Sequence, residues 1–393
     1  MDFELSEELK ALQKLARDFA EREIAPSVTA DERARRFPRE LVTRMGELGF
    51  FGCPIPEEYG GNNMGFKAHV IVCEEIARAS CSLGVSFNTQ TMGTSRTILE
   101  FGDEAQKKNY IPKLVSAEWL GCLAVTEPEA GSDVAAMRTT AIKEGEYYSI
   151  NGTKTWISFA QVADVGVVFA YTEPGLRHRG ISSFIIEMKT PGISLSPDQE
   201  KLGWRAAPTA EIYFDEVKVP SSSLLGEPGR GFEIMLRCFD NIRLTAAARA
   251  VGNCQAIIDE TIKYATQRVQ FGQQIGRFQM VQEAIARMVV ETEAARLLTY
   301  RCAMQKDKGF LNNTRETSMA KYFASEVASR IADEAFRIFG AYGCSGQYPM
   351  GRLLRDAKMH QILDGSANIH KLIIGADALG YKKANRFGHV SSS

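Results

Sequence analysis

The chain has 393 residues, of which 45% are hydrophobic and 24% charged, and its formal net charge is −1 at pH 7. This length supports two or three domains with substantial cores, and a near-neutral charge without a basic cluster argues against nucleic-acid binding. No stretch approaches the roughly 18 apolar residues that a membrane span needs.

The N-terminal part is predicted to be helical. Its opening stretch, MDFELSEELKALQKLARDFAEREIAP, has the charged amphipathic pattern of a helix. It lacks the positive start and apolar core of a secretory signal, so we expect a cytoplasmic protein. Helical periodicity continues to about residue 119 and is interrupted by the loop GFFGCPIPEEYGG. These features predict a helical domain over residues 1–119.

The middle of the chain reads as β structure. The stretches YYSINGTKTWISF, DVGVVFAYT, GISSFIIEM and AEIYFDEVKV are short, rich in β-branched and aromatic residues, and bounded by turn residues. We predict a β domain, a barrel or a sandwich, over residues 120–228. No GxGxxG motif follows a strand, which disfavours a Rossmann dinucleotide-binding domain.

The C-terminal part, residues 229–393, is predicted to be a four-helix-bundle-like domain. No proline occurs between Pro228 and Pro349, and this absence favours long uninterrupted helices. Small residues from Ala246 to Gly252 would allow close contact between helices. The predicted fold class is therefore α+β multidomain, with helical, β and helical domains in that order.

Metal and disulfide chemistry are not expected. The eight cysteines include no CxxC pair, and the five histidines include no HExxH motif. In a chain of this size without a secretory signal we expect the cysteines to be reduced.

Two stretches carry candidate chemistry. In LGCLAVTEPEAGSD, residues 120–133, a strand leads into a polar turn whose backbone donors could hold a flavin edge or a phosphate, although such a turn can also be an ordinary connection. In RDAKMHQILDGSANIHKLIIG, Asp364 precedes a helical pattern. On local pattern alone, Asp364 is an N-cap.

The chain as a whole resembles the acyl-CoA dehydrogenase family. The motifs that carry the resemblance are IPEEYGG (55–61), LAVTEPEAGSD (123–133), NGTKTWIS (151–158), FDEVKVP (214–220), RVQFGQQIGRFQ (268–279) and RDAKMHQILDGSANI (355–369). Their order and spacing are those of the family. The resemblance implies the family's three-domain fold, non-covalent FAD, an acyl-CoA substrate, electron-transferring flavoprotein as the electron acceptor, and a homotetramer.

The resemblance also implies roles for individual residues. Cofactor contacts are expected from Leu123, Val125, Thr126, Ser132, Trp156, Ser158, Arg337, Ala341, Ser366 and Asn368, and from Arg268 and Phe271 toward the FAD of a neighbouring subunit. Substrate contacts are expected from Thr91, Ser132, Asp240, Arg243 and Gly365. For Arg243 an ordinary surface ion pair is the alternative. Arg337 and Ala341 depart from the Gln and Gly usual in the family, which affects the expected ADP contacts.

The expected base is also a departure. Most family members have a Glu at the position of Asp364, and some place the base on the long helix, where this chain has Ile242. The resemblance therefore makes Asp364 the base that removes the substrate's α-proton. Its side chain is shorter than that of Glu, which favours a substrate that is bulky at Cα, such as cyclohexanecarboxyl-CoA.

Other substrates and reactions stay open. They are a straight-chain or glutaryl-type acyl-CoA dehydrogenase, a 1,4-eliminating cyclohexenecarboxyl-CoA dehydrogenase, an oxidase similar to nitroalkane oxidase, and a non-redox acyl-CoA-binding protein or lyase. The stretch FNTQTMG contains no Asp or Glu, which disfavours 1,4-elimination. Glutaryl-CoA dehydrogenases have an Arg near the position of Gly84 for the distal carboxylate, and a glycine cannot take that role.

Overall fold

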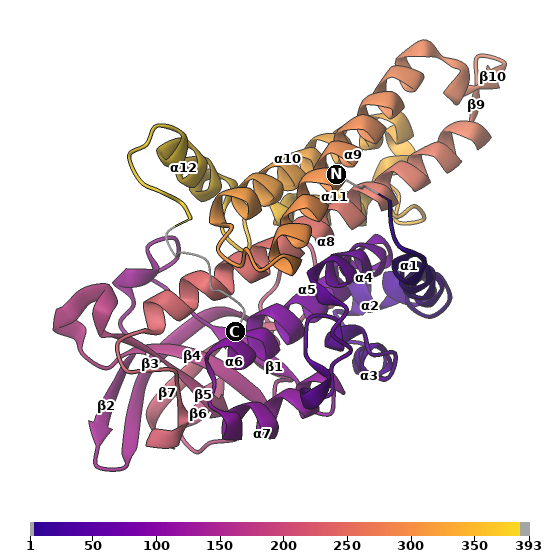
Figure 1. The fold of residues 1–393 in the computed structure, drawn as a ribbon. Helices are drawn as coiled ribbons and strands as arrows, with labels where there is room; N and C mark the ends of the chain where they lie inside the picture. The colour runs from indigo at the N-terminus through magenta and orange to yellow at the C-terminus, as the bar shows by residue number, and fades with distance from the viewer. Residues whose placement is uncertain (1–3, 386–393) are drawn as a thin grey trace.

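The computed structural model describes residues 4–385, and its elements follow the predicted helical, β and helical order (Figure 1). The N-terminal helices cover the lower right of Figure 1. Two π-helical segments, Ala20–Ile24 and Thr89–Ser95, continue α1 and α5. The N-terminal helices are α1 (Glu7–Phe19), α2 (Val28–Ala34), α3 (Arg39–Glu47), α4 (Gly65–Ala79), α5 (Cys81–Asn88), α6 (Arg96–Phe101) and α7 (Glu104–Val115).

The central domain is built on an eight-stranded sheet in the order β6-β7-β3-β2-β4-β5-β8, with β1 parallel to β4. The two longest strands, β3 and β7, pair antiparallel, and their register shifts twice. The second shift, between Lys154 and Ile157, shapes the candidate site. The strands are β1 (Gly121–Ala124), β2 (Thr140–Glu144), β3 (Tyr147–Ser158), β4 (Val165–Tyr171), β5 (Ile181–Glu187), β6 (Ile193–Leu195), β7 (Thr209–Pro220) and β8 (Leu224–Leu225).

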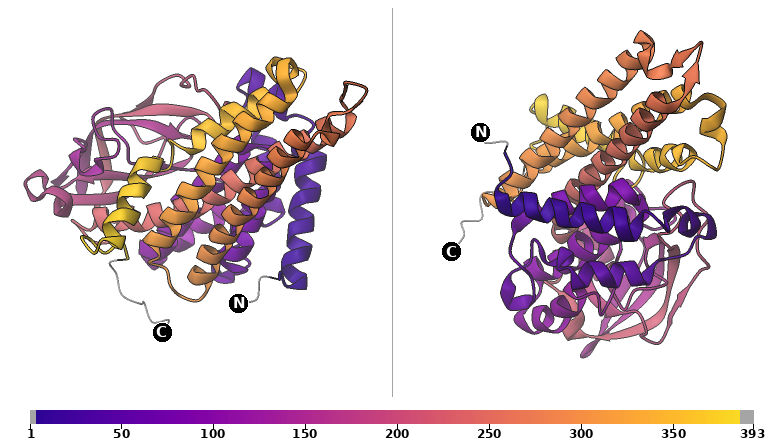
Figure 2. Two further views of the ribbon diagram at one scale, coloured as in Figure 1. Left: turned by 90° about the horizontal axis from the view of Figure 1, so that it is seen from above. Right: turned by 90° about the vertical axis from the view of Figure 1, so that its right-hand side faces the viewer.

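The proline-poor segment forms the long helices that its pattern predicts. They are α8 (Gly231–Gln267), α9 (Gln279–Asp307) and α10 (Thr314–Phe339), followed by the 3₁₀ segment Gly340–Cys344, α11 (Met350–His360) and α12 (Ala367–Ala378). A hairpin of β9 (Val269–Gln270) and β10 (Gln273–Gln274) joins α8 to α9. Figures 1 and 2 show that this hairpin projects from the far end of the bundle, away from the sheet.

The two helical domains share one hydrophobic core. Phe50, Phe87 and Ile76 belong to the same buried cluster as Val251 and Ile331. The small residues of α8 permit this contact, because a Cβ on Gly252 would lie 2.3 Å from the carbonyl oxygen of Glu74. The expected close helix contact is thus confirmed between α4 and α8.

The sheet has apolar contacts on both faces. One cluster joins its strands to α6 and α7, and another lies between β3, β5 and β7. Between α7 and β1, and between β8 and α8, the chain has short connections, at which we propose the domain boundaries 119/120 and 228/229. Among residues 4–385, no helix combines the length and apolar character that crossing a membrane requires.

Candidate active site

Trp156 stands on a bulge of β3 and presents its indole outward. The bulge lies between Lys154 and Ile157 in the pairing with β7, and Trp156 has a φ of 59°. A β-bulge redirects a side chain, and here 49% of the Trp156 surface is exposed although both sequence neighbours are buried. Ser158 ends the same strand opposite Thr209. The structure therefore presents a large aromatic face and a hydroxyl from one edge of the β domain.

A buried ion pair fixes the polar loop beside this bulge. The Lys154 ammonium lies 2.8 Å from Glu127 Oε1 and also donates to the Val125 carbonyl at 3.1 Å. Glu127 further accepts from the Thr139 N–H and hydroxyl, while the Thr155 N–H donates to Thr126 at 2.8 Å. These bonds hold the loop from Val125 against β3. Both charged residues lie within the family motifs, but sequence reasoning gave neither a role.

The charges of this pair depend on each other. Burial lowers the pKa of the Lys154 ammonium to about 8, and Glu127 opposes that shift. Burial acts to raise the pKa of Glu127, but the Lys154 ammonium and the hydrogen bonds from Thr139 and Arg138 outweigh it and lower the pKa. The charged forms are thus compensated locally, as a buried pair requires.

Asp364 lies in the tight connection between α11 and α12, and it is not the cap of α12. The N-cap is Ser366, whose hydroxyl accepts from the Ile369 N–H at 3.4 Å. The cap interpretation of Asp364 is therefore wrong. Asp364 itself has a φ of 58°, a left-handed conformation that is uncommon outside glycine and is found at functional sites. Gly365 follows with a φ of 92°.

A buried lysine of α10 fixes this connection through hydrogen bonds to its backbone. Lys321 donates to the Gly365 carbonyl at 2.5 Å and to the His360 carbonyl at 2.8 Å. Burial lowers the pKa of Lys321 to about 7, and the negative charge of Asp364 opposes that shift. Lys321 thus ties the left-handed turn to the bundle.

The Asp364 carboxylate has a cationic partner that the sequence did not reveal. The Arg249 guanidinium of α8 lies 2.5 Å from Asp364 Oδ2. The Arg249 side chain is 1% exposed and the Asp364 side chain 25% exposed. Asp364 therefore sits at the boundary between the packed bundle and accessible space.

Further unpaired polar atoms surround Gly365. A Cβ at Gly365 would lie 3.2 Å from His370 Nε2 and 3.5 Å from Arg243 Nη2. Both ring nitrogens of His370 and the Nε of Arg243 are buried without a hydrogen-bond partner among the described residues. Burial lowers the pKa of His370 to about 2, with the Arg243 charge adding to the shift, so the imidazole is neutral. Buried polar groups without partners are rare and mark places where a ligand or water completes the structure.

Of the other three predicted substrate contacts, Ser132 is exposed, whereas Asp240 and Thr91 are buried. Asp240 is buried, accepts from the Thr314 hydroxyl at 2.5 Å, and lies 3.8 Å from Arg243. Burial raises its pKa against the neighbouring positive charges. The Thr91 hydroxyl donates to the Phe87 carbonyl at 2.6 Å within the π-helical segment. Asp240 therefore lies beside Arg243 as its negatively charged neighbour. Thr91 has no carboxyl group and cannot act as a base.

The β domain and the Asp364 connection meet in one small apolar cluster. Phe159, which follows Ser158, belongs to this cluster with Trp204 and Met359, and Leu363, which precedes Asp364, packs against it. Ile242 is 8% exposed, and its Cδ1 lies 3.9 Å from a Cβ placed on Gly93. The alternative base position on α8 is thus occupied by an aliphatic side chain, which cannot accept a proton.

The predicted neighbour-subunit contacts lie elsewhere, at the projecting end of the bundle (Figure 1). Phe271 is 94% exposed there, and the Arg268 guanidinium lies 5.0 Å above the Tyr342 ring. Arg337 forms an exposed ion pair with Asp333 at 2.8 Å, and Ala341 is exposed. Within one chain, these four residues therefore lie apart from Trp156 and Asp364.

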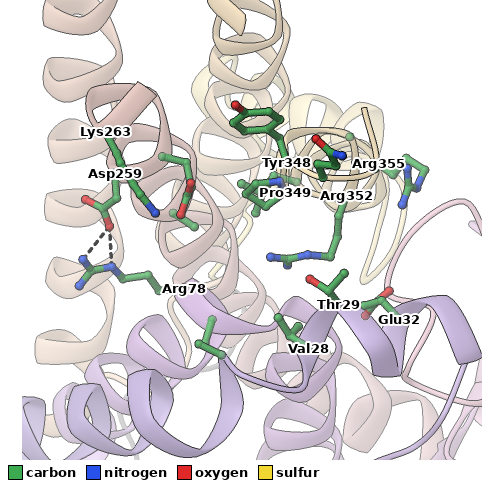
Figure 3. Close-up of a pocket in the computed structure, with 18 of the residues that line it drawn as sticks. Val28, Thr29, Glu32, Arg78, Asp259, Lys263, Tyr348, Pro349, Arg352 and Arg355 are labelled. Atoms are coloured by element: carbon green, nitrogen blue, oxygen red, sulfur yellow. Dashed lines mark hydrogen bonds and ion pairs between the residues drawn. The ribbon is translucent and has the colours of Figure 1, made fainter. Parts of the chain in front are cut away.

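A cavity of about 540 Å³ opens at the junction of α1, α2, α8 and α11, and Figure 3 shows its lining. Arg352 and Lys263 point into it, and Arg78 pairs with Asp259 at its edge. None of the predicted cofactor or substrate residues lines it. The cavity is therefore distinct from the site at Asp364.

The residues present fit FAD and give no sign of a metal. An exposed indole suits a planar ring system, and the unpartnered nitrogens of His370 and Arg243 can bond polar groups of a ligand. The half-buried Arg268 carries a positive charge that suits a pyrophosphate. Within residues 4–385, no group of three or more His, Cys, Asp or Glu side chains is arranged to hold a metal ion.

Comparisons with known proteins identify the family of this chain. Family models match the chain over residues 6–118 (acyl-CoA dehydrogenase, N-terminal domain), 122–217 (middle domain) and 229–379 (C-terminal domain). Glutaryl-CoA dehydrogenase of Desulfococcus multivorans is 51% identical over 98% of this chain and 100% of that protein.

Two solved structures show the same fold. The glutaryl-coenzyme A dehydrogenase glutaryl-CoA complex has a TM-score of 0.97 at 51% identity and covers 99% of each chain. A chain from a study entitled electron transferring flavoprotein of Acidaminococcus fermentans has a TM-score of 0.95 at 36% identity, over 96% of this chain and 100% of that chain. The chain described here therefore belongs to the acyl-CoA dehydrogenase family and is an FAD-dependent acyl-CoA dehydrogenase.

Proposed function

We propose that this dehydrogenase oxidises an acyl-CoA that is bulky at Cα, of the cyclohexanecarboxyl-CoA type, with Asp364 as the base. The observation that carries the proposal is the placement of Asp364. Its carboxylate is partly exposed at the junction of the β domain and the bundle, while Ile242 and Thr91 offer no carboxylate. The left-handed turn directs Asp364 out of α11 and leaves capping of α12 to Ser366.

In the proposed reaction the Cα–H proton passes to Asp364, the Cβ hydrogen leaves as a hydride, and a Cα=Cβ double bond forms. FAD, when bound, supplies the hydride acceptor. The Asp364 N–H makes no hydrogen bond within residues 4–385, so we propose that it donates to the thioester oxygen. A donor aimed at the oxygen where enolate charge develops is a large source of transition-state stabilisation. Arg243 and His370 lie close enough to Gly365 to add polar contacts.

We further propose which residues hold the ligands. Trp156, Ser158, Leu123, Val125, Thr126 and Ser132 would contact FAD from the β domain, and Ser366 and Asn368 from the start of α12. Arg243, with Asp240 behind it, Thr91, Ser132 and Gly365 would line the acyl-CoA side. These assignments are supported by position, because most of the residues lie next to the bulge of β3, at the start of α12, or on the face of α8 next to Gly365.

Side-chain length supports a bulky acyl group. Asp is one methylene shorter than Glu, so its carboxylate reaches about 1.5 Å less far. A misplacement on that scale costs on the order of a hundredfold in rate unless the substrate's Cα lies nearer. A ring or branch at Cα fills the space between the base and the cofactor and can bring Cα closer.

A glutaryl-type activity is the second candidate, because the relative from Desulfococcus multivorans and the structure with glutaryl-CoA are both 51% identical to this chain. A distal carboxylate needs an available cation in the acyl pocket. Arg249 is a buried cation beside Gly84, but its guanidinium is already paired with Asp364. Arg249 is therefore not free to bind a distal carboxylate, and Arg243, whose Nε is unpartnered beside Gly365, is the cation that a glutaryl group could use.

We also propose a homotetramer in which Arg268 and Phe271 complete the FAD site of a neighbour, with Arg337 and Ala341 in the region that would contact the ADP part of FAD. Phe271, Arg337 and Ala341 are exposed and Arg268 is half-buried, and their position at the projecting end of the bundle, apart from Trp156 and Asp364 of the same chain, supports this arrangement. Electron-transferring flavoprotein is the proposed acceptor, supported by the family and by the similar chain from the Acidaminococcus fermentans study. The proposed location is the cytoplasm.

The proposal is tested by anaerobic bleaching of the flavin with a panel of acyl-CoAs. The panel contains cyclohexanecarboxyl-CoA, a branched-chain acyl-CoA, butyryl-CoA, glutaryl-CoA and cyclohexenecarboxyl-CoA. We expect the cyclic saturated thioester to give the highest rate, and Asp364→Glu to shift preference toward butyryl-CoA. Fastest bleaching by glutaryl-CoA would establish the second candidate. Substrate-dependent oxygen uptake would indicate an oxidase, and no bleaching with any thioester would indicate a non-redox protein.

A further inference from the structure

Arg249 has no role in the site as assembled so far, yet it is the one side chain that hydrogen bonds to the Asp364 carboxylate within residues 4–385. We propose that Arg249 is a positioning residue for the base: it fixes one carboxylate oxygen of Asp364 so that the other faces the substrate's α-proton. This inference rests on the proposed role of Asp364 and deepens it. Arg249 reaches Asp364 across 115 residues of sequence.

Two contacts besides Asp364 hold the Arg249 side chain before any ligand binds. Its centre lies 4.2 Å above the Trp204 ring, where a cation is attracted to the aromatic face. Trp204 is itself held in place, because it is buried and its backbone N–H donates to Asp356 Oδ1 at 2.9 Å. The Arg249 stem packs against α5, since a Cβ on Gly84 would lie 3.0 Å from both Cγ and Cδ of Arg249. The arginine is therefore held both at its aliphatic stem and at its guanidinium group.

The ion pair uses only one side of the carboxylate. Arg249 Nη2 contacts Asp364 Oδ2, and Oδ1 makes no hydrogen bond within the described part of the chain. A carboxylate held through one oxygen keeps a defined side-chain rotamer and presents the other oxygen in a fixed direction. Arg243 and Lys321 also face this region, but Lys321 is bonded to two backbone carbonyls and Arg243 to no carboxylate oxygen of Asp364. Arg249 alone among the described cations orients the base directly.

This arrangement explains how a short base can work. The backbone of Asp364 is fixed by Lys321 through Gly365, and its side chain by Arg249. Catalytic groups must be held to a fraction of an ångström, because an error of about 1 Å costs on the order of a hundredfold in rate. Arg249 compensates for the missing methylene by removing rotational freedom from the carboxylate.

The test compares Arg249→Met with Arg249→Lys in the FAD-loaded enzyme, using the fastest acyl-CoA of the bleaching panel and its α-deuterated form. We expect Arg249→Met to slow flavin reduction about a hundredfold, to raise the isotope effect, and to leave FAD content and affinity for the enoyl-CoA product within twofold. Arg249→Lys should restore part of the rate. Arg78→Met removes an arginine–aspartate ion pair, with Asp259, that is more exposed and lies outside the site, and should leave the reduction rate unchanged.

A full reduction rate in Arg249→Met would overturn the proposal. So would a loss of rate that follows loss of FAD with no change in isotope effect and no rescue by Lys, because that pattern indicates a purely structural role. If Arg249→Met does not fold, Arg249→Lys and Gly84→Ala decide. Gly84→Ala presses a methyl group against the arginine stem and should slow reduction several-fold. Full rates in both variants would refute the positioning role.

A double-mutant cycle separates this inference from the base assignment. In an Asp364→Asn background, Arg249→Met should cause little further loss, because residues acting as one unit are non-additive. Fully additive losses would show that Arg249 acts independently of Asp364. If Asp364→Asn reduces flavin normally, the base assignment itself fails. If Asp364→Asn abolishes reduction while Arg249→Met does not affect it, only the positioning role fails.

Discussion

Replacing Asp364 with Asn separates its chemical role from its structural one. Asn keeps the shape of Asp and a carbonyl oxygen that can accept from Arg249, but it cannot take a proton at neutral pH. If Asp364 is the base, the variant should lose at least the roughly 10²–10⁴-fold that general-base catalysis contributes. FAD should remain bound, because the carboxylate is not among the proposed cofactor contacts.

The structure also sets the expected cost in stability. Loss of an N-cap would cost about 1 kcal/mol, but that role belongs to Ser366. Asp364→Asn instead leaves the Arg249 guanidinium, only 1% exposed, without a counter-charge. Breaking a buried pair by removing one partner costs about 3–5 kcal/mol. We expect a loss near the lower end, because Asp364 is itself a quarter exposed and Asn still accepts a hydrogen bond.

The assay is anaerobic stopped-flow bleaching with the fastest acyl-CoA, alongside urea unfolding at a fixed FAD concentration, since bound cofactor adds to apparent stability. The matched control is Asp259→Asn, which removes a carboxylate from the more exposed Arg78 and should leave bleaching unchanged. Near-normal bleaching by Asp364→Asn would show that another group takes the proton. A stability loss no larger than that of Asp259→Asn would refute the reasoning from the buried pair.

Two further predictions concern the cofactor site. Glu127→Gln leaves the fully buried Lys154 without its counter-charge, so we expect a loss of about 3–5 kcal/mol in unfolding free energy and a lower flavin-to-protein absorbance ratio. The control variant Glu129→Gln, at an exposed position, should change neither quantity. Unaltered stability in Glu127→Gln would contradict the assigned pairing. Arg268→Ala should weaken FAD binding by removing a charge for the pyrophosphate, whereas Arg277→Ala at the same end of the bundle should not. Equal FAD affinity in both variants, or an active monomer by light scattering, would argue against a site completed by a neighbour.

Much of the fold follows from local sequence. The proline-free segment from Pro228 to Pro349 predicted α8, α9 and α10, because a long helix needs only an uninterrupted backbone pattern and an apolar face. The β-branched stretches bounded by turn residues likewise predicted β3, β4, β5 and β7. The motif order predicted the family, and with it FAD and acyl-CoA chemistry.

Only the tertiary structure decided which charges meet. Arg249 and Asp364 are 115 residues apart, and Glu127 and Lys154 are joined across a loop and a strand bulge. Neither ion pair can be predicted from the sequence spacing of its two residues. Contacts between elements depend on how helices cross and how strands are aligned, not on local pattern. The cap was misassigned for a related reason. Asp364 and Ser366 are both good capping residues, and the left-handed turn that chooses between them is held by Lys321 from another helix.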